Sequence, residues 1–279
     1  MNNPILSIDD FKKLQDNPNL VVFDVHVGAD APTQYRKKHI KGARFLDLEK
    51  DLAEVPEDAA NGGRHPLPSV EKFQEALEHT GVSDESILVV YDDKGGANAA
   101  ARLWWMLKSF DFNEVYILNG GFQNAEKHEV AMESGEPIFE KGRLTPRHAW
   151  LLPIKSISEV EMNLKNNEAT VIDVRDAYRY RGESEPIDLV AGHIPGAINI
   201  PFSENLNDAG EFLPVDELRA KYLELLKNKP EKLIVHCGSG VTACHSILAL
   251  SAAGFEMPSL YVGSWSEWSR TSRPIAKDV

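Results

Sequence analysis

The residues of this chain best suited to chemistry lie in one stretch, HCGSGVTAC, which runs from His236 to Cys244. The apolar run KLIVHC leads into Cys237, and TACHSILALSAAG follows with helical spacing, so the sequence predicts a turn between a buried strand and a helix. The backbone N–H groups of such a turn and the partial positive charge of the helix N-terminus form an anion-binding site. A thiol placed there is a candidate nucleophile.

The residues around this cysteine have different predicted roles. Gly238 and Gly240 permit backbone conformations and close approaches that side chains block. Val241 and Thr242 are expected to contribute N–H groups to the anion site rather than side-chain chemistry. Cys244 lies inside the helical pattern, and packing in the core is favoured there over a redox role.

Two classes of enzyme use a cysteine in such a loop. In the cysteine phosphatases an arginine six positions after the cysteine clamps the phosphate. This sequence has Ala243 at that position, so phosphoryl chemistry would lack its main charge clamp. The other class is the sulfurtransferases, in which the cysteine carries a persulfide, and this class is favoured.

The composition narrows the range of partners and compartments. The chain has 279 residues and a net charge of -13, which argues against nucleic acid and anionic membranes as partners. Its two cysteines cannot form a disulfide framework, and no apolar stretch approaches the roughly 20 residues of a membrane span. The N-terminal sequence MNNPILSIDDFKKL does not resemble a signal peptide. We therefore expect a cytoplasmic protein with reduced cysteines.

The chain contains two copies of one sequence pattern. NLVVFDV in the first half matches EATVIDVR in the second, HIKGA matches HIPGA, and SILVVYDD matches EKLIVHCG. In this pairing Asp92 stands opposite Cys237, so the first copy has no cysteine in its loop. The first copy is therefore expected to lack the nucleophile.

The order of apolar runs and amphipathic segments predicts the fold class. In each half, short apolar runs alternate with helical patterns, which is typical of an α/β fold with a mostly parallel sheet flanked by helices. We expect an N-terminal domain at 1–132 and a C-terminal catalytic domain at 154–279. The region 133–153 is rich in glycine and proline and is interpreted as the linker.

The chain resembles the tandem-domain rhodaneses over nearly its whole length, in HIKGA, ARLWWML, YILNGG, GHIPGA and GSWSEW. The loop CGSGVTA resembles the active loop of the 3-mercaptopyruvate sulfurtransferases of that family. The resemblance implies two rhodanese-like domains and a sulfurtransferase that works through a persulfide on Cys237. It implies no metal and no organic cofactor.

The same resemblance implies further site residues. Arg179 matches the arginine that binds the substrate carboxylate, with a surface ion pair to the nearby glutamates as the alternative. Ser239 matches a serine that pairs with an acidic residue and a histidine of the N-terminal half, positions held by Glu49 and His65. The alternatives are a solvated carboxylate for Glu49 and a loop residue without a role for His65.

Two positions bear on the choice of donor. Relatives that prefer thiosulfate carry basic or bulky residues after the cysteine, whereas this chain has Gly238 and Ser239. Relatives that use mercaptopyruvate usually carry a second arginine where this chain has Ile187, and Arg181 or Arg64 are alternatives for that missing charge.

The prediction is a transfer reaction in two half-reactions. The donor 3-mercaptopyruvate leaves its sulfur on Cys237 and departs as pyruvate. An acceptor thiol or cyanide then removes the sulfur, with a thioredoxin-like protein as one alternative acceptor. Two other functions stay open, a thiosulfate:cyanide sulfurtransferase and a carrier that only receives persulfides from a partner.

Overall fold

The computed structural model describes residues 3–227 and 229–278, which form two compact units. The first unit consists of Met1–Ala53, Pro68–Leu151 and Asp208–Phe212. The second consists of Glu54–Leu67, Leu152–Asn207 and Leu213–Val279. Each unit therefore includes a short segment from the other half of the sequence, and the segment in the second unit contains His65.

The first unit is built around a parallel sheet of five strands in the order β1-β6-β5-β2-β4. A separate antiparallel pair joins β3 to β7. The strands are β1 (Ile5–Leu6), β2 (Leu20–Asp24), β3 (His39–Ile40), β4 (Ala43–Phe45), β5 (Ile87–Tyr91), β6 (Val115–Leu118) and β7 (Met132–Glu133). The helices are α1 (Ile8–Leu14), α2 (Ala31–Lys37), α3 (Val70–His79), α4 (Ala99–Ser109) and α5 (Gly121–Lys127).

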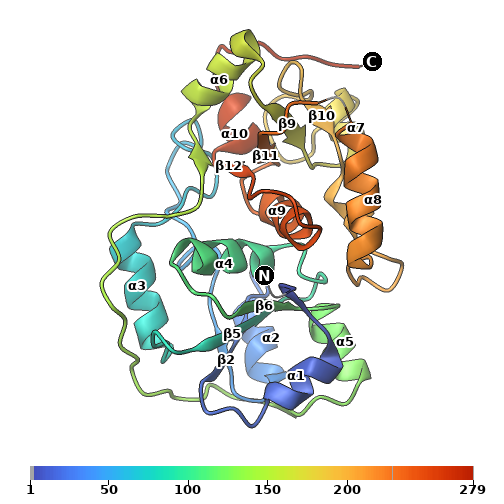
Figure 1. The fold of residues 1–279 in the computed structure, drawn as a ribbon. Helices are drawn as coiled ribbons and strands as arrows, with labels where there is room; N and C mark the ends of the chain where they lie inside the picture. Colours follow the sequence, from blue (N-terminus) through green and yellow to red (C-terminus); the bar gives the residue numbers. More distant parts are fainter. Residues whose placement is uncertain (1–2, 228, 279) are drawn as a thin grey trace. The chain divides into compact units, whose positions relative to one another are not determined.

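Local sequence explains the elements of the first unit. The central strands β2 and β5 read LVVFD and ILVVY, and the valines of both strands are buried on the two faces of the sheet. Ser69 caps α3 by accepting a hydrogen bond from the N–H of Lys72. In Figure 1, α4 lies over one face of the sheet and α1, α2 and α5 lie over the other. The side chains of α4 are buried almost all round, as its apolar sequence predicts.

The second unit repeats this architecture with a parallel sheet in the order β10-β9-β11-β12-β8. The strands are β8 (Ile154–Lys155), β9 (Thr170–Asp173), β10 (Ile198–Asn199), β11 (Leu233–His236) and β12 (Ser259–Tyr261). The helices are α6 (Ile157–Asn166), α7 (Ala177–Arg181), the 3-10 helix η1 (Phe202–Asn205), α8 (Val215–Leu225), α9 (Thr242–Ala252) and α10 (Ser264–Trp268). The predicted α/β class, with a parallel sheet flanked by helices in each half, is confirmed.

The second unit places its strand-to-helix loops at one edge of the sheet. Helix α6 begins with a capping box, in which Ser156 and Glu159 exchange hydrogen bonds, and it packs through Val160 against the sheet. Strand β11 pairs in parallel with β9, so that His236 lies beside Asp173 at the ends of the two strands. The loop after β11 therefore starts at the carboxyl edge of the sheet, where ligands bind in open α/β folds.

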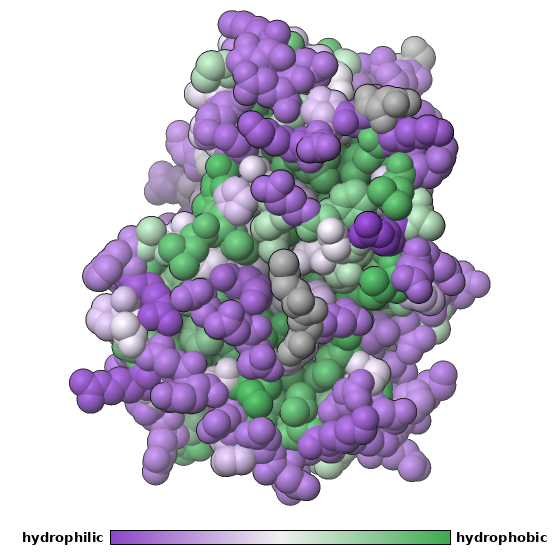
Figure 2. Space-filling view, viewed as in Figure 1, coloured by the Kyte–Doolittle hydropathy of each residue, from purple (hydrophilic) through white to green (hydrophobic). Residues whose placement is uncertain are grey.

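The surface and the core follow the usual division of side chains. In the view of Figure 2, most side chains on the visible face are hydrophilic. The large apolar side chains Trp104, Trp105, Trp265 and Trp268 are buried. Within residues 3–227 and 229–278, no helix has both the length and the apolar character needed to cross a membrane.

Candidate active site

Cys237 lies in the turn that joins β11 to α9, as the sequence predicts. Its side chain is buried, at 1% exposure. Its N–H donates to Oγ of Ser264 at 3.2 Å, and its carbonyl oxygen accepts a hydrogen bond from the N–H of Trp265 at 3.0 Å. These two bonds tie the start of the turn to α10 and fix the backbone that carries the thiol.

The two glycines of the loop are required for different reasons. Gly240 has a φ of +75°, and an added Cβ would lie 2.5 Å from the carbonyl oxygen of Val262. Gly238 has an ordinary φ, but a Cβ there would lie 3.0 Å from Nη2 of Arg64 and 3.6 Å from Nη2 of Arg179. Gly240 therefore shapes the turn, whereas Gly238 lets two guanidinium groups approach the backbone beside the nucleophile.

The loop presents backbone donors that the fold leaves unused. In the described part of the chain, the N–H groups of Ser239, Val241, Thr242 and Ala243 donate no hydrogen bond. Thr242 is the first residue of α9, so its N–H and that of Ala243 are among the donors that a helix cannot satisfy itself. Together with the helix dipole, these groups make the loop a site for a negatively charged sulfur or substrate group.

Ser239 and His65 are brought together as predicted. Oγ of Ser239 lies 2.8 Å from Nδ1 of His65, and Ser239 is buried at 7% exposure. His65 comes from the segment 54–67, which packs in the second unit. The pair is positioned to hold or move a proton within the loop that carries the thiol.

The position of His65 depends on contacts between its segment and α10. The N–H of Arg64 donates to Oγ of Ser266 at 3.0 Å. Gly63 has a φ of +88° and packs so closely on Gly263 that any Cβ would overlap its carbonyl oxygen. Burial raises the pKa of the Glu267 carboxyl, while hydrogen bonds from Tyr261 and from the Gly62 N–H oppose that rise.

Glu49 belongs to the first unit, whereas the other predicted site residues belong to the second. Its side chain is exposed, and its backbone N–H donates to Oδ1 of Asp47 at 2.9 Å. A partnership of Glu49 with Ser239 and His65 therefore stays a prediction.

Arg179 is the third residue of α7 and is buried at 8% exposure. Its guanidinium group donates to Glu185, with Nη2 at 2.7 Å from Oε1, and Nη2 also lies 3.3 Å from Oδ2 of Asp188. The ion pair considered as the alternative role is present, but it is buried and borders Gly238. The geometry is therefore compatible with binding an anion next to Cys237.

The sequence indicated nearby glutamates as ion-pair partners of this arginine, and Glu185 is one of them, but it did not reveal Asp188. Burial raises the pKa of Asp188, although Arg64 lowers it. Burial alone would raise the pKa of Glu185, but hydrogen bonds from Arg179 and from two backbone N–H groups lower it below its ordinary value. Arg270 also reaches the carboxylate of Asp188, at 3.5 Å from Oδ1. The only signal was the acidic character of the segment after α7.

His236 has a structural role in this geometry. It is fully buried, with Nε2 at 3.7 Å from Oδ2 of Asp173. Burial lowers its pKa despite the opposing charge of Asp173, so the imidazole is neutral at neutral pH. Asp173 instead accepts charged hydrogen bonds from Arg175, with Nη2 at 2.6 Å from Oδ2.

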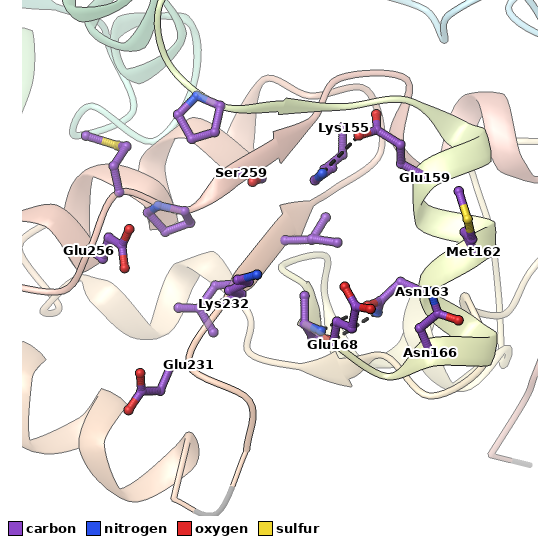
Figure 3. Close-up of a pocket in the computed structure, with 16 residues that line it drawn as sticks. Lys155, Glu159, Met162, Asn163, Asn166, Glu168, Glu231, Lys232, Glu256 and Ser259 are labelled. Carbon is purple, nitrogen blue, oxygen red and sulfur yellow. Dashed lines mark hydrogen bonds and ion pairs between the residues drawn. The ribbon is translucent and has the colours of Figure 1, made fainter.

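A cavity of about 470 Å³ lies elsewhere in the second unit, at the starts of β8, β11 and β12. Figure 3 shows Lys155 and Glu159 paired on one side of it and Asn163 nearby on α6. The cavity is lined by residues at the beginning of β11, whereas Cys237 follows the end of that strand. None of the predicted site residues lines it, so its size does not mark the reactive centre.

Comparisons with known proteins agree with this architecture. A profile of the family described as "Rhodanese-like domain" matches residues 7–128 and 156–271. The "Probable 3-mercaptopyruvate sulfurtransferase" of Pseudomonas aeruginosa is 40% identical over 266 residues, which cover 93% of each chain. The thiosulfate sulfurtransferase of Gallus gallus is 34% identical over 89% of this chain and 84% of its own. The structure of 3-mercaptopyruvate sulfurtransferase from Leishmania major superimposes with a TM-score of 0.82 at 31% identity, covering 95% of this chain and 74% of that one.

The chain belongs to the rhodanese-like family and contains two tandem copies of its domain. Its relatives carry the names of sulfurtransferases, so the prediction of that enzyme class is confirmed. Both mercaptopyruvate and thiosulfate appear in those names.

Proposed function

We propose that this enzyme transfers sulfur from 3-mercaptopyruvate to a thiol or cyanide through a persulfide on Cys237. The observation that supports this proposal most is the setting of Cys237, which precedes unused N–H donors at the start of α9 and is followed by Gly238, next to Arg64 and the buried Arg179. An anionic persulfide would be stabilised by those donors without any rearrangement of the loop. In this proposal, Gly240 shapes the loop, Gly238 lets Arg64 and Arg179 approach it, and Val241 and Thr242 supply N–H groups.

In the first half-reaction the thiolate of Cys237 attacks the sulfur of 3-mercaptopyruvate. A sulfur–sulfur bond forms, and the carbon–sulfur bond breaks with its electron pair on carbon. The resulting enolate takes up a proton and leaves as pyruvate. Ser239 and His65 are the pair that would deliver this proton, because they are hydrogen bonded to each other and Ser239 lies two residues after Cys237 in the same loop.

In the second half-reaction an acceptor thiolate attacks the outer sulfur of the persulfide. The sulfur–sulfur bond breaks, the acceptor becomes a persulfide, and Cys237 returns as a thiolate. Cyanide in the same role yields thiocyanate. A thioredoxin-like protein is the protein acceptor that we propose. We also propose a cytoplasmic location, and the two free cysteines are in keeping with a reducing compartment. Fractionation of cells with immunoblotting tests that location.

The choice between donors rests on charge. Thiosulfate is a compact dianion, yet Gly238 and Ser239 put no cationic side chain on the loop itself. Mercaptopyruvate has one carboxylate, which Arg179 can bind, and a keto oxygen, which the loop N–H groups can bind. We expect kcat/KM to favour mercaptopyruvate by at least about tenfold, which needs only about 1.4 kcal/mol.

Mass spectrometry of the intact protein tests this function. After incubation with 3-mercaptopyruvate, the wild-type chain should gain the mass of one sulfur atom and lose it on addition of cyanide. Cys237→Ser should gain nothing, whereas Cys244→Ser should behave like the wild type. Sulfur on Cys244 alone would overturn the assignment of the nucleophile. Loading only from a protein donor would show that the chain is a carrier.

A further inference from the structure

Asp188 is a buried carboxylate surrounded by three guanidinium groups. Its side chain is fully buried, and its Oδ1 lies 3.4 Å from Nε of Arg64 and 3.5 Å from Nη1 of Arg270. Its Oδ2 lies 3.3 Å from Nη2 of Arg179. Within the described residues, Oδ1 accepts no hydrogen bond and Nε of Arg64 donates none. The three arginines thus surround this carboxylate without fully satisfying it.

This group of charges borders the residue that follows the nucleophile. A Cβ on Gly238 would lie 3.0 Å from Nη2 of Arg64 and 3.6 Å from Oδ2 of Asp188. The side chains of Arg64 and Arg270 are 28% and 19% exposed, so both are partly accessible to solvent. A small anion that approaches Cys237 therefore meets these cations together with their internal counter-ion.

The charges in this region can be counted from their contacts. The arginine cluster comprises four arginines and three carboxylates, namely Arg64, Arg175, Arg179, Arg270, Asp173, Glu185 and Asp188. One positive charge therefore remains. That charge matches the single carboxylate of mercaptopyruvate and falls one short of the dianion thiosulfate. In a partly buried site, a difference of one charge is felt strongly because water screens it poorly.

We propose that Asp188 determines donor specificity by holding the net charge of the arginine cluster at one. Arg64 and Arg270 act with Arg179 as the cations of the donor site, since Ile187 offers no charge. This inference rests on the proposed sulfur transfer, and it adds the residue that selects the sulfur donor. Removal of the Asp188 charge leaves the cations in place and raises the net charge, which favours a dianion over a monoanion.

Steady-state kinetics of Asp188→Asn with both donors test the inference. We expect the ratio of kcat/KM for thiosulfate to that for mercaptopyruvate to rise about tenfold. Asp188→Glu keeps the charge and should stay within about twofold of the wild type. Glu183→Gln removes an exposed charge paired with Arg181 outside the cluster, and it should leave the ratio unchanged. A purely structural role would lower both activities together without moving the ratio.

A second variant, expected to shift the ratio of kcat/KM values in the opposite direction, keeps the test decisive if Asp188→Asn does not fold. Arg270→Gln removes a cation from the same carboxylate and should lower the ratio, because the dianion loses more attraction than the monoanion. An unchanged ratio in the folded variants would overturn the inference while leaving sulfur transfer intact. Absence of both turnover and persulfide in the wild type would instead overturn the proposed function.

Discussion

In the first unit the loop between β5 and α4 carries Asp92, and in the second unit the matching loop between β11 and α9 carries Cys237. The carboxylate of Asp92 accepts hydrogen bonds at 2.8–3.2 Å from four N–H groups, three in its own loop and one in the first turn of α4. The donors are Lys94 and Gly96 to Oδ1, and Asn98 and Ala100 to Oδ2. Burial raises the pKa of Asp92, and these four N–H bonds oppose that rise.

The difference shows how one loop serves two purposes. In the first unit a carboxylate from the protein itself fills the anion site, so the loop is closed to any substrate. In the second unit the thiol of Cys237 is too short and too weak an acceptor to do the same, and the N–H groups remain available. The loop of the first unit thus stabilises the fold, and that of the second is open for chemistry.

The surrounding framework is the same in both units. Tyr35 stacks on His39 with ring centroids 4.0 Å apart, and Tyr180 stacks on His193 at 3.8 Å. In each pair the histidine Nδ1 lies within 2.8 Å of the tyrosine carbonyl oxygen. The residue before the tyrosine is the exposed Gln34 in one unit and Arg179 in the other. The copies therefore share their support and differ where an anion would bind.

The largest effect is expected from giving the second loop the residue of the first. Cys237→Asp should lower the rate of sulfur transfer by a factor of about 10³ or more, because no nucleophilic thiol remains. The new carboxylate should accept the unused N–H groups and make this variant about 1–2 kcal/mol more stable than Cys237→Ser, because charge-assisted hydrogen bonds are strong. Thermal unfolding and donor turnover measure both effects. A Cys237→Asp protein less stable than Cys237→Ser would show that the two loops are not equivalent.

The reciprocal change tests the closed loop of the first unit. Asp92→Ala leaves four N–H groups without their acceptor and should destabilise the first unit by about 3–5 kcal/mol, as expected for a buried charged network. Asp92→Asn keeps one acceptor oxygen and should fall between this variant and the wild type. Denaturant unfolding gives the free energies. Equal stability of all three proteins would contradict the role assigned to Asp92.

Arg179 and its counterpart Gln34 form a matched pair for activity. Arg179→Ala should raise KM for mercaptopyruvate by roughly 10- to 150-fold, because a charge-assisted pair contributes about 1.5–3 kcal/mol. Gln34→Ala changes the equivalent exposed position of the first unit and should leave KM unaltered. Circular dichroism verifies that both variants are folded. An unaltered KM in Arg179→Ala would reduce this arginine to its ion pairs with Glu185 and Asp188.

Much of this arrangement follows from local sequence. The α/β class and the strand, turn and helix around Cys237 are encoded in residues that are neighbours along the chain, so pattern and composition predict them. The pairing of Ser239 with His65 was reached only through resemblance to a family, because these residues lie far apart in sequence. The repeat also predicted Asp92 opposite Cys237.

The acidic centre of the arginine cluster was beyond prediction from the sequence. Arg64, Asp188 and Arg270 come from three separate segments, and none has a local pattern that distinguishes it from a solvated charge. The resemblance placed His65 of segment 54–67 in the site, but the packing of this segment in the second unit is seen only in the structure. Burial and long-range charge contacts are properties of the folded chain, so a single sequence does not specify them.

The smallest predicted effect is a pH dependence of stability. It concerns the residue two positions after Asp24, which ends β2, and after Asp173, which ends β9. His26 pairs there with Asp24 in the first unit, and Arg175 pairs with Asp173 in the second. Burial alone would lower the pKa of His26, but its hydrogen bond with Asp24 and the charge of that carboxylate raise it above 6.5. The arginine pair stays charged across the neutral range, whereas the histidine pair titrates.

The direction of the pH effect follows from this shift. A histidine whose pKa is higher in the folded state gives its full stabilisation below the unfolded value of about 6.5, and it loses that stabilisation as pH rises through the folded pKa. The melting temperature of the first unit should therefore fall over this range in the wild type and stay flatter in His26→Gln. His79→Gln, on the exposed end of α3, is the control and should follow the wild type. Parallel curves of melting temperature against pH for the wild type and His26→Gln would show that no charged His26–Asp24 pair stabilises the first unit. The equivalent pairs of the two units would then both be independent of pH in this range.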